Sequence, residues 1–177
     1  MSDAEKDVVI KARPSWRRRV LRWSIEGALM LGIFWAVQAY QKRDAPQGAA
    51  PQLEARTITG QQVSLATPRE GAVLVHFWAT WCPICRMEQG SIQRLAQDYS
   101  VISVASQSGE PAAVLAFMRE QGLSFPAVAD PAGYWASQFN VRAFPMSFII
   151  DKYGVIRFVE IGFTSETGLR ARLALAS

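Results

Sequence analysis

The chain of 177 residues has two cysteines, Cys82 and Cys85, in the sequence Trp81-Cys-Pro-Ile-Cys85. A continuous apolar run at residues 72–78 precedes them. A helix is predicted over residues 82–99 by an apolar stripe at Ile84, Ile92, Leu95, Ala96 and Tyr99. At a helix start, Cys82 faces unsatisfied backbone N–H groups, which favour a thiolate over a thiol. Cys85 follows one turn later, where it can attack a mixed disulfide held on Cys82. The spacing therefore predicts a redox dithiol, with Cys82 as the nucleophile and Cys85 as the resolving thiol.

Other interpretations of the cysteine pair are weaker. A purely structural disulfide would constrain one turn that the helix already fixes, so it would add little stability. A zinc site normally has three or four protein ligands, but the only histidine, His76, falls in the middle of the apolar run. We therefore expect no zinc site and no resident metal. A Cu(I) site made from the two thiolates, with Met87 or Met146 nearby, stays open as the alternative.

Predicted strands and helices alternate around this pair. Strands are expected at residues 72–78, 101–105, 127–129, 146–150 and 155–161, with a leading hairpin at 56–65 that turns at Thr59-Gly60. Helices are expected at 82–99, 110–121, 132–139 and 165–176, the last with Ser165 as its N-cap. This order indicates an α/β layer structure that ends in an antiparallel hairpin.

Composition excludes several broad classes. Half of the residues are hydrophobic, which excludes a wholly disordered chain, and two cysteines are too few for a disulfide-stapled miniprotein. The net charge is +4, but residues 1–43 have nine Lys/Arg against four Asp/Glu, whereas residues 44–177 have ten against eleven. The positive charge therefore belongs to the N-terminal segment, and we expect no nucleic-acid partner.

This N-terminal segment has the features of a membrane anchor. Residues 1–19 form a predicted basic cytoplasmic tail, and residues 20–41 a transmembrane signal anchor, because about 21 helical residues span roughly 31 Å. Arg22 and Glu26 interrupt the apolar run. The excess of basic residues before the run predicts a cytoplasmic N-terminus and a periplasmic body at a bacterial inner membrane. A cleaved signal peptide and a twin-arginine signal stay open. Residues 42–52 read as a flexible linker, and residues 53–177 as the domain.

The string from Val73 to Cys85, VLVHFWATWCPIC, resembles the active-site strand and helix of the thioredoxin fold in the TlpA-like family. Within that family the chain is most similar to the membrane-anchored ScsD-type protein disulfide oxidoreductases, over about residues 53–177. The resemblance implies a thioredoxin fold with an N-terminal β-hairpin and an inserted helix and strand at residues 110–129. It also implies a thiol:disulfide oxidoreductase that acts on exported proteins and whose redox-active disulfide, Cys82–Cys85, needs no other cofactor.

The same resemblance suggests the partners and the direction of electron flow. Tethered relatives are mostly reductants recharged by a transmembrane electron carrier, so we expect a reductant rather than an oxidant. The Pro-Ile pair between the cysteines differs from the Gly-Pro of thioredoxin, and this pair tunes the reduction potential. A non-catalytic Cu(I)-binding module of a copper-tolerance system is the alternative function.

Further site residues come from the same family pattern. Residues 141–151 match the segment in which a cis-proline faces the dithiol, so Pro145 is expected to be cis and Phe144 to contact substrate. Trp81, next to the nucleophile, is expected to join them in substrate binding. His76 stands six residues before Cys82, where thioredoxin has a buried acid, which makes it a candidate proton acceptor. A core histidine with a satisfied hydrogen bond is the other interpretation of His76.

Overall fold

The computed structural model describes residues 16–43, 48–66 and 70–177. Two compact units divide the chain, residues 1–41 and residues 42–177. Most of the predicted basic tail and residues 44–47 of the predicted linker lie outside the described residues. The first unit contains nearly all of helix α1 (Trp16–Arg43), which is 28 residues long.

Helix α1 includes the whole of the predicted transmembrane anchor, residues 20–41. Among its described side chains, Trp23, Leu29 and Ile33 are exposed. Arg22 and Glu26 interrupt the apolar run of its sequence. Across the described residues, no helix combines the length and the apolar character that crossing a membrane requires.

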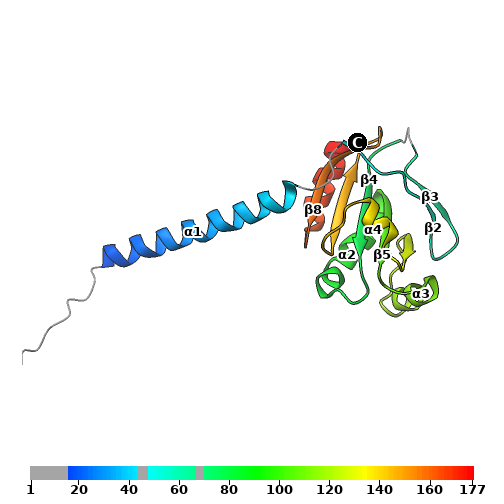
Figure 1. The fold of residues 1–177 in the computed structure, drawn as a ribbon, viewed down its shortest axis with the longest axis horizontal. Coiled ribbons are helices and arrows are strands. Elements are labelled where there is room, and N and C mark those ends of the chain that lie inside the picture. The colour runs from blue at the N-terminus through cyan, green and yellow to red at the C-terminus, as the bar shows by residue number, and fades with distance from the viewer. Residues whose placement is uncertain (1–15, 44–47, 67–69) are drawn as a thin grey trace, which may run out of the picture. The chain divides into compact units, whose positions relative to one another are not determined.

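A six-stranded mixed sheet forms the centre of the second unit, in the order β1-β8-β7-β4-β5-β6 (Figure 1). Its strands are β1 (Gly48–Ala49), β4 (Val73–Trp78), β5 (Ser100–Ser106), β6 (Ala127–Asp130), β7 (Met146–Ile150) and β8 (Val155–Ile161). β4, β5 and β6 are parallel, whereas β7 pairs antiparallel with both β4 and β8. All six residues of β4 are buried, which explains why its sequence is apolar except at His76.

Helices and a small hairpin cover the two faces of this sheet. The hairpin consists of β2 (Glu54–Arg56) and β3 (Gln62–Ser64), and the helices are α2 (Pro83–Asp98), α3 (Pro111–Glu120), α4 (Tyr134–Gln138) and α5 (Glu166–Ala176). Alternation along β4 places Leu74 and Trp78 in one core cluster with residues of α2, α3 and α5. Val75 and Phe77 belong to the other cluster, which includes residues of α4 and residues that flank the hairpin.

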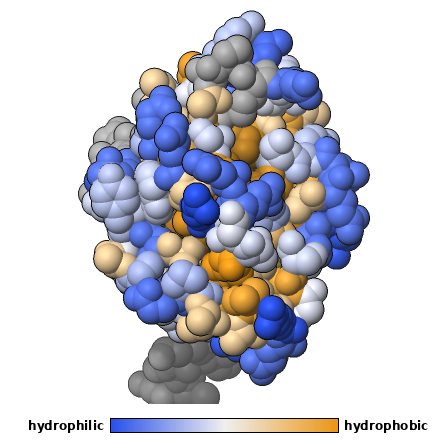
Figure 2. Space-filling model, turned by 90° about the vertical axis from the view of Figure 1, so that its right-hand side faces the viewer, coloured by the Kyte–Doolittle hydropathy of each residue, from blue (hydrophilic) through white to orange (hydrophobic). Residues whose placement is uncertain are grey.

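Figure 2 shows one side of the molecule, where hydrophilic residues cover most of the surface. Apolar residues reach the surface there mainly in the lower half of the view. The large apolar side chains of the two core clusters are buried, and each contributes about 1.5–3 kcal/mol by its burial.

The predicted alternation of strands and helices is confirmed, as are the leading hairpin, the inserted α3 and β6, and the N-cap at Ser165. Three segments differ from prediction. The first strand of the hairpin is Glu54–Arg56, whereas the predicted hairpin begins at residue 56. Helix α4 begins at Tyr134 and not at residue 132, because Gly133 has a left-handed backbone with φ of 72°. Residues 48 and 49, expected to be linker, form β1 and pair with β8. Their small side chains show no strand pattern. They form a strand because they pair with the free edge of β8.

Candidate active site

The two cysteines lie where strand β4 gives way to helix α2. Cys82 is the N-cap of α2, and its Sγ accepts a hydrogen bond from the backbone N of Cys85 at 3.2 Å. Pro83 occupies the first helical position, where its missing N–H leaves no bond unmade. Cys82 and Cys85 form a disulfide, and their Cα atoms are 5.3 Å apart. The sequence thus folds the pair into one helical turn, as the spacing predicts.

The two sulfur-bearing residues differ in their access to solvent. Cys82 keeps 4% of its surface exposed, whereas Cys85 is fully buried. A substrate can therefore reach Cys82 first, because a buried sulfur is shielded from a protein partner. This geometry favours the predicted roles, with Cys82 as the attacking nucleophile and Cys85 as the resolving thiol.

The segment before β7 reaches the dithiol from a distant part of the sequence. The peptide bond between Phe144 and Pro145 is cis, as predicted. Cys82 Sγ lies 3.7 Å from the carbonyl oxygen of Phe144. The backbone at this bond therefore lies beside the reactive sulfur, where an extended substrate chain can approach it.

Trp81 is the third predicted substrate-binding residue. Its indole Nε1 donates a hydrogen bond to the backbone oxygen of Gln107 at 3.0 Å, and its ring meets that of Phe144 edge-on at 5.8 Å between centroids. Even so, 56% of the Trp81 surface is exposed. The structure thus brings Trp81, Phe144 and Pro145 together at Cys82, with the indole held in place but available for contact.

His76 has a different environment. It is buried in the middle of β4, and its Nδ1 lies 2.9 Å from the hydroxyl oxygen of Ser147 on β7. Burial lowers the pKa of His76 from 6.5 to about 3, because a charged imidazolium would lose its hydration. The imidazole is therefore neutral at physiological pH and a weak proton acceptor. Its role as the acceptor stays a prediction, and its geometry is that of a core histidine with a partner.

A second buried ionisable residue, Glu88, was not among the predicted site residues. Glu88 is fully buried on α2, one turn after Cys85 and on the same face. Its Oε1 accepts a hydrogen bond from the backbone N of Thr164 at 2.7 Å, whereas Oε2 has no hydrogen-bond partner among the described residues. Burial raises the pKa of Glu88 from 4.5 to about 7, although the bond from Thr164 acts against this rise. Glu88 can therefore hold or release a proton at neutral pH.

The spacing of buried residues along α2 indicates that Glu88 lies on the buried face of the helix. The predicted apolar stripe included Ile84, but Ile84 is 46% exposed, and the buried face consists of Cys85, Glu88, Gln89, Ile92 and Leu95. Counting back from Ile92 by three or four positions reaches Glu88 and Gln89, and a further step of three or four reaches Cys85. An acid at a stripe position next to a reactive cysteine is the feature that marks Glu88. Residues i and i+3 of a helix have Cβ atoms about 5–6 Å apart.

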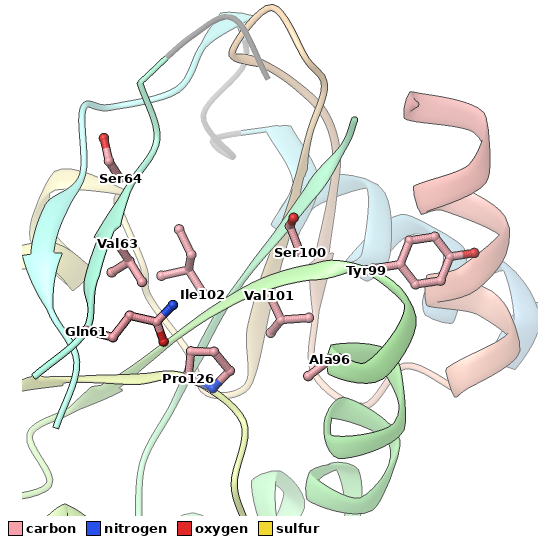
Figure 3. A pocket seen from close by; sticks show the side chains of 9 residues that line it. All are labelled: Gln61, Val63, Ser64, Ala96, Tyr99, Ser100, Val101, Ile102 and Pro126. Carbon is pink, nitrogen blue, oxygen red and sulfur yellow. The ribbon is translucent and has the colours of Figure 1, made fainter. Parts of the chain in front are cut away.

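A pocket of about 320 Å³ lies away from this site (Figure 3). It is lined by Gln61, Val63, Ser64, Ala96, Tyr99, Ser100, Val101, Ile102 and Pro126. Residues 100–102 begin β5 and pair with the first residues of β4, whereas the dithiol follows the last residue of β4. The pocket and the cysteines are therefore at opposite ends of the sheet.

The alternative Cu(I) site would combine the two cysteines with Met87 or Met146. In the described parts of the chain, no group of three or more His, Cys, Asp or Glu residues is placed to hold a metal ion. Of the two methionines considered for a Cu(I) site, Met146 belongs to the core cluster on the other face of the sheet from the cysteines. Met87 is 70% exposed on α2.

Comparison with known proteins agrees with this geometry. The AhpC/TSA family matches residues 46–159. The thioredoxin-like protein YneN of Bacillus subtilis is 32% identical over 147 residues, which is 78% of this chain and 86% of YneN. The thiol-disulfide oxidoreductase ResA of Geobacillus kaustophilus is 28% identical over 165 residues, which is 89% of this chain and 95% of ResA.

Solved structures show the same fold. A thiol:disulfide interchange protein of the thioredoxin family from Chlorobium tepidum superposes with a TM-score of 0.64 and 26% identity, covering 75% of this chain and 98% of that one. The chain therefore belongs to the AhpC/TSA family of thioredoxin-like proteins and is a thiol-disulfide oxidoreductase.

Proposed function

We propose that the protein reduces disulfides in exported proteins through Cys82 and Cys85. The observation that carries this proposal is the asymmetry of the pair: Cys82 is reachable at the N-terminus of α2, Cys85 is fully buried behind it, and the cis bond before Pro145 lies beside Cys82. In such an arrangement the Cys82 sulfur reacts with the substrate, and the Cys85 sulfur then attacks the mixed disulfide.

The exchange proceeds in two displacements. In the reduced protein, the Cys82 thiolate attacks one sulfur of the substrate disulfide, and the other substrate sulfur leaves as a thiolate. Cys85 then gives its proton to Glu88 and attacks Cys82 Sγ, which releases the second substrate thiolate and forms the Cys82–Cys85 disulfide. Two electrons pass from the dithiol to the substrate. The N-terminus of α2 stabilises the attacking thiolate in the first step.

The surroundings of Cys85 support the reductive direction. Cys85 is fully buried, and the carboxyl group of Glu88 lies one turn away on the same helix face. Both features disfavour a charged Cys85 thiolate, and so favour the disulfide over the reduced pair. The measurement is the reduction potential of the pair by equilibration with glutathione. A value near that of thioredoxin, about −270 mV, supports a reductant, and a value near that of DsbA, about −120 mV, contradicts it.

Activity and metal binding can be separated on the full-length chain. Insulin reduction, followed by turbidity, is expected with the wild-type protein and should be lost in Cys82→Ser. Cys85→Ser should instead accumulate a mixed disulfide with insulin, because the resolving thiol is missing. Tight Cu(I) binding by the reduced protein without insulin reduction would overturn the proposal in favour of the copper-binding module.

The proposed location is the periplasmic side of a bacterial inner membrane, with α1 as the attachment. The basic segment before the apolar run and the exposed apolar side chains of α1 support this location. The measurement is protease accessibility of residues 48–177 in intact cells and in spheroplasts, together with carbonate extraction of membranes. Digestion in spheroplasts only is expected, and recovery in the cytosol contradicts the location.

The proposed redox partner is a transmembrane electron carrier with a dithiol of its own. The chain has two cysteines in all, so each turnover uses its whole reducing capacity and an outside thiol must restore it. Rapid alkylation of living cells reports the redox state of Cys82 and Cys85. A mainly reduced pair is expected, and a fully oxidised pair at steady state contradicts a supply of electrons.

A further inference from the structure

Exposed apolar side chains gather near the dithiol. In the described part of residues 48–177, the exposed large apolar residues are Trp81, Ile84, Met87, Tyr134, Tyr153, Phe163 and Leu175. The first three lie within five residues of Cys82. Phe163 comes from another segment, the loop between β8 and α5, and is 55% exposed. Single exposed apolar residues are common, but several around one reactive group mark a contact surface.

Two hydrogen bonds fix the loop that carries Phe163. The backbone N of Gly162 donates to the oxygen of Pro145 at 2.8 Å, and the backbone N of Thr164 donates to Glu88 Oε1 at 2.7 Å. In addition, Ile161 pairs with Met146 at this end of the sheet. Phe163 is therefore held between a residue bound to the cis-proline and a residue bound to the buried acid.

The backbone at Gly162 contributes to this placement. Gly162 has φ of 80°, which L side chains rarely adopt, and no atom lies within 4 Å of where its Cβ would be. The requirement for glycine is thus conformational. With hydrogen bonds on both sides and a turn before it, the backbone at Phe163 is held at the dithiol end of the sheet, where the side chain is exposed.

We propose that Phe163 is a specificity-determining residue, which together with Trp81 and Ile84 contacts the substrate chain and selects cysteines that have apolar neighbours. Cysteines in such a setting are covered in folded proteins and accessible in chains that have not finished folding. The substrate class is therefore exported polypeptides that are still unfolded around a wrong or premature disulfide. This inference rests on the proposed disulfide exchange.

The test uses the reduced full-length protein in single-turnover reactions with two synthetic peptides. Each peptide contains one cysteine joined to glutathione by a disulfide, and the peptides have equal length and charge. One has Phe and Leu beside the cysteine, and the other has Ser at both positions. Attack by Cys82 releases glutathione, and attack by Cys85 then releases the peptide thiol, which is quantified by chromatography after an acid quench.

The expected result is that wild-type protein reduces the apolar peptide about tenfold faster than the serine peptide, which corresponds to 1.4 kcal/mol. Phe163→Ser should bring this ratio close to one, whereas Phe163→Leu should retain most of it. Tyr153→Ser is the matched control, because Tyr153 is 72% exposed at the other end of the same β7–β8 hairpin. It should leave the ratio unchanged.

Two outcomes overturn the inference. One is a wild-type ratio near one, and the other is a Phe163→Ser variant that slows both peptides equally and keeps the ratio, as a purely structural effect would. Failure of the proposed exchange looks different, because the wild-type protein would then reduce neither peptide faster than Cys82→Ser does.

Discussion

Two buried ionisable side chains, His76 in β4 and Glu88 in α2, respond in opposite ways to the same physical cause. Burial favours the uncharged form of each, so it lowers the pKa of His76 to about 3 and raises the pKa of Glu88 to about 7. The first shift moves the group away from physiological pH, and the second moves it into that range. His76 also has a side-chain partner in Ser147, whereas one oxygen of Glu88 has none among the described residues.

This difference shows that burial alone does not make a proton-transfer group. What matters is whether the shifted pKa approaches the working pH, because a general acid or base works best there. By this criterion Glu88 suits the transfer of the Cys85 proton better than His76 does. Each of the following variants tests this contrast between His76 and Glu88.

The largest effect is expected from Glu88→Gln on disulfide exchange. Loss of a positioned proton acceptor typically costs a factor of 10²–10⁴, so the rate of the resolving step at pH 7 should fall about 100-fold. The pH profile of the wild-type rate should inflect near pH 7, and that inflection should vanish in the variant. Stopped-flow measurement of mixed-disulfide decay between pH 5 and pH 9 provides both values. An unchanged profile in Glu88→Gln, together with an altered one in His76→Asn, would reverse the contrast.

The second effect concerns His76 and acid stability. Because the folded pKa of about 3 is below the unfolded value of 6.5, the unfolded state alone takes up this proton as the pH falls. His76 thus lowers the free energy of unfolding by about 1.4 kcal/mol per pH unit below pH 6.5, or about 2 kcal/mol at pH 5. His76→Asn should remove this part of the slope. Urea unfolding at pH 5 and pH 7 measures it, and an equal slope in both proteins contradicts the assignment.

The third effect has the opposite sign. The folded pKa of Glu88, about 7, is above the unfolded value of 4.5, so the unfolded state loses this proton first as the pH rises. The contribution of Glu88 to the free energy of unfolding is therefore fully present below pH 4.5, and it is lost as the pH rises through 7. Glu88→Gln should be more stable than wild type by about 1–2 kcal/mol at pH 8, less than the full shift because the new amide N–H groups need partners. At pH 4 this gain should be absent.

The smallest effect is expected from Ser147→Ala. It removes the hydroxyl group beside His76 Nδ1 and should cost about 1 kcal/mol in the free energy of unfolding. Ser103→Ala, at the position paired with His76 on β5, is the comparison variant, because it removes a similar buried bond, from the indole of Trp78 at 3.2 Å, and retains the hydroxyl group beside His76 Nδ1. If Ser147→Ala slows disulfide exchange much more than Ser103→Ala does, the orientation of His76 matters to the chemistry.

The elements that the sequence predicts correctly are those whose pattern is compatible with one local structure. The apolar run of β4 needs cover on both faces, and the cysteine spacing after it determines one helical turn, so the sheet, α2 and the position of the dithiol followed directly. Residues 48 and 49 were not predicted as a strand, because their pairing depends on the free edge of β8. Glu88 was not predicted as a site residue, because an acidic residue in a helix is expected to be exposed. Its burial follows from the sequence only if the buried stripe of α2 is counted from Ile92 and not from Ile84. Phe163 was not predicted either, because its position depends on the hydrogen bonds of Gly162 and Thr164, which no residue spacing indicates.

The sulfur of Cys82 is also the N-cap of α2, because it accepts a hydrogen bond from the backbone N of Cys85. An inactive variant made with alanine would therefore remove the nucleophile and fray the first turn together, at a cost of about 1 kcal/mol. Serine retains an acceptor for the Cys85 N–H, so Cys82→Ser is the cleaner inactive reference for binding and folding assays. A phenotype seen with the alanine variant alone could report a loosened helix and not a missing thiol.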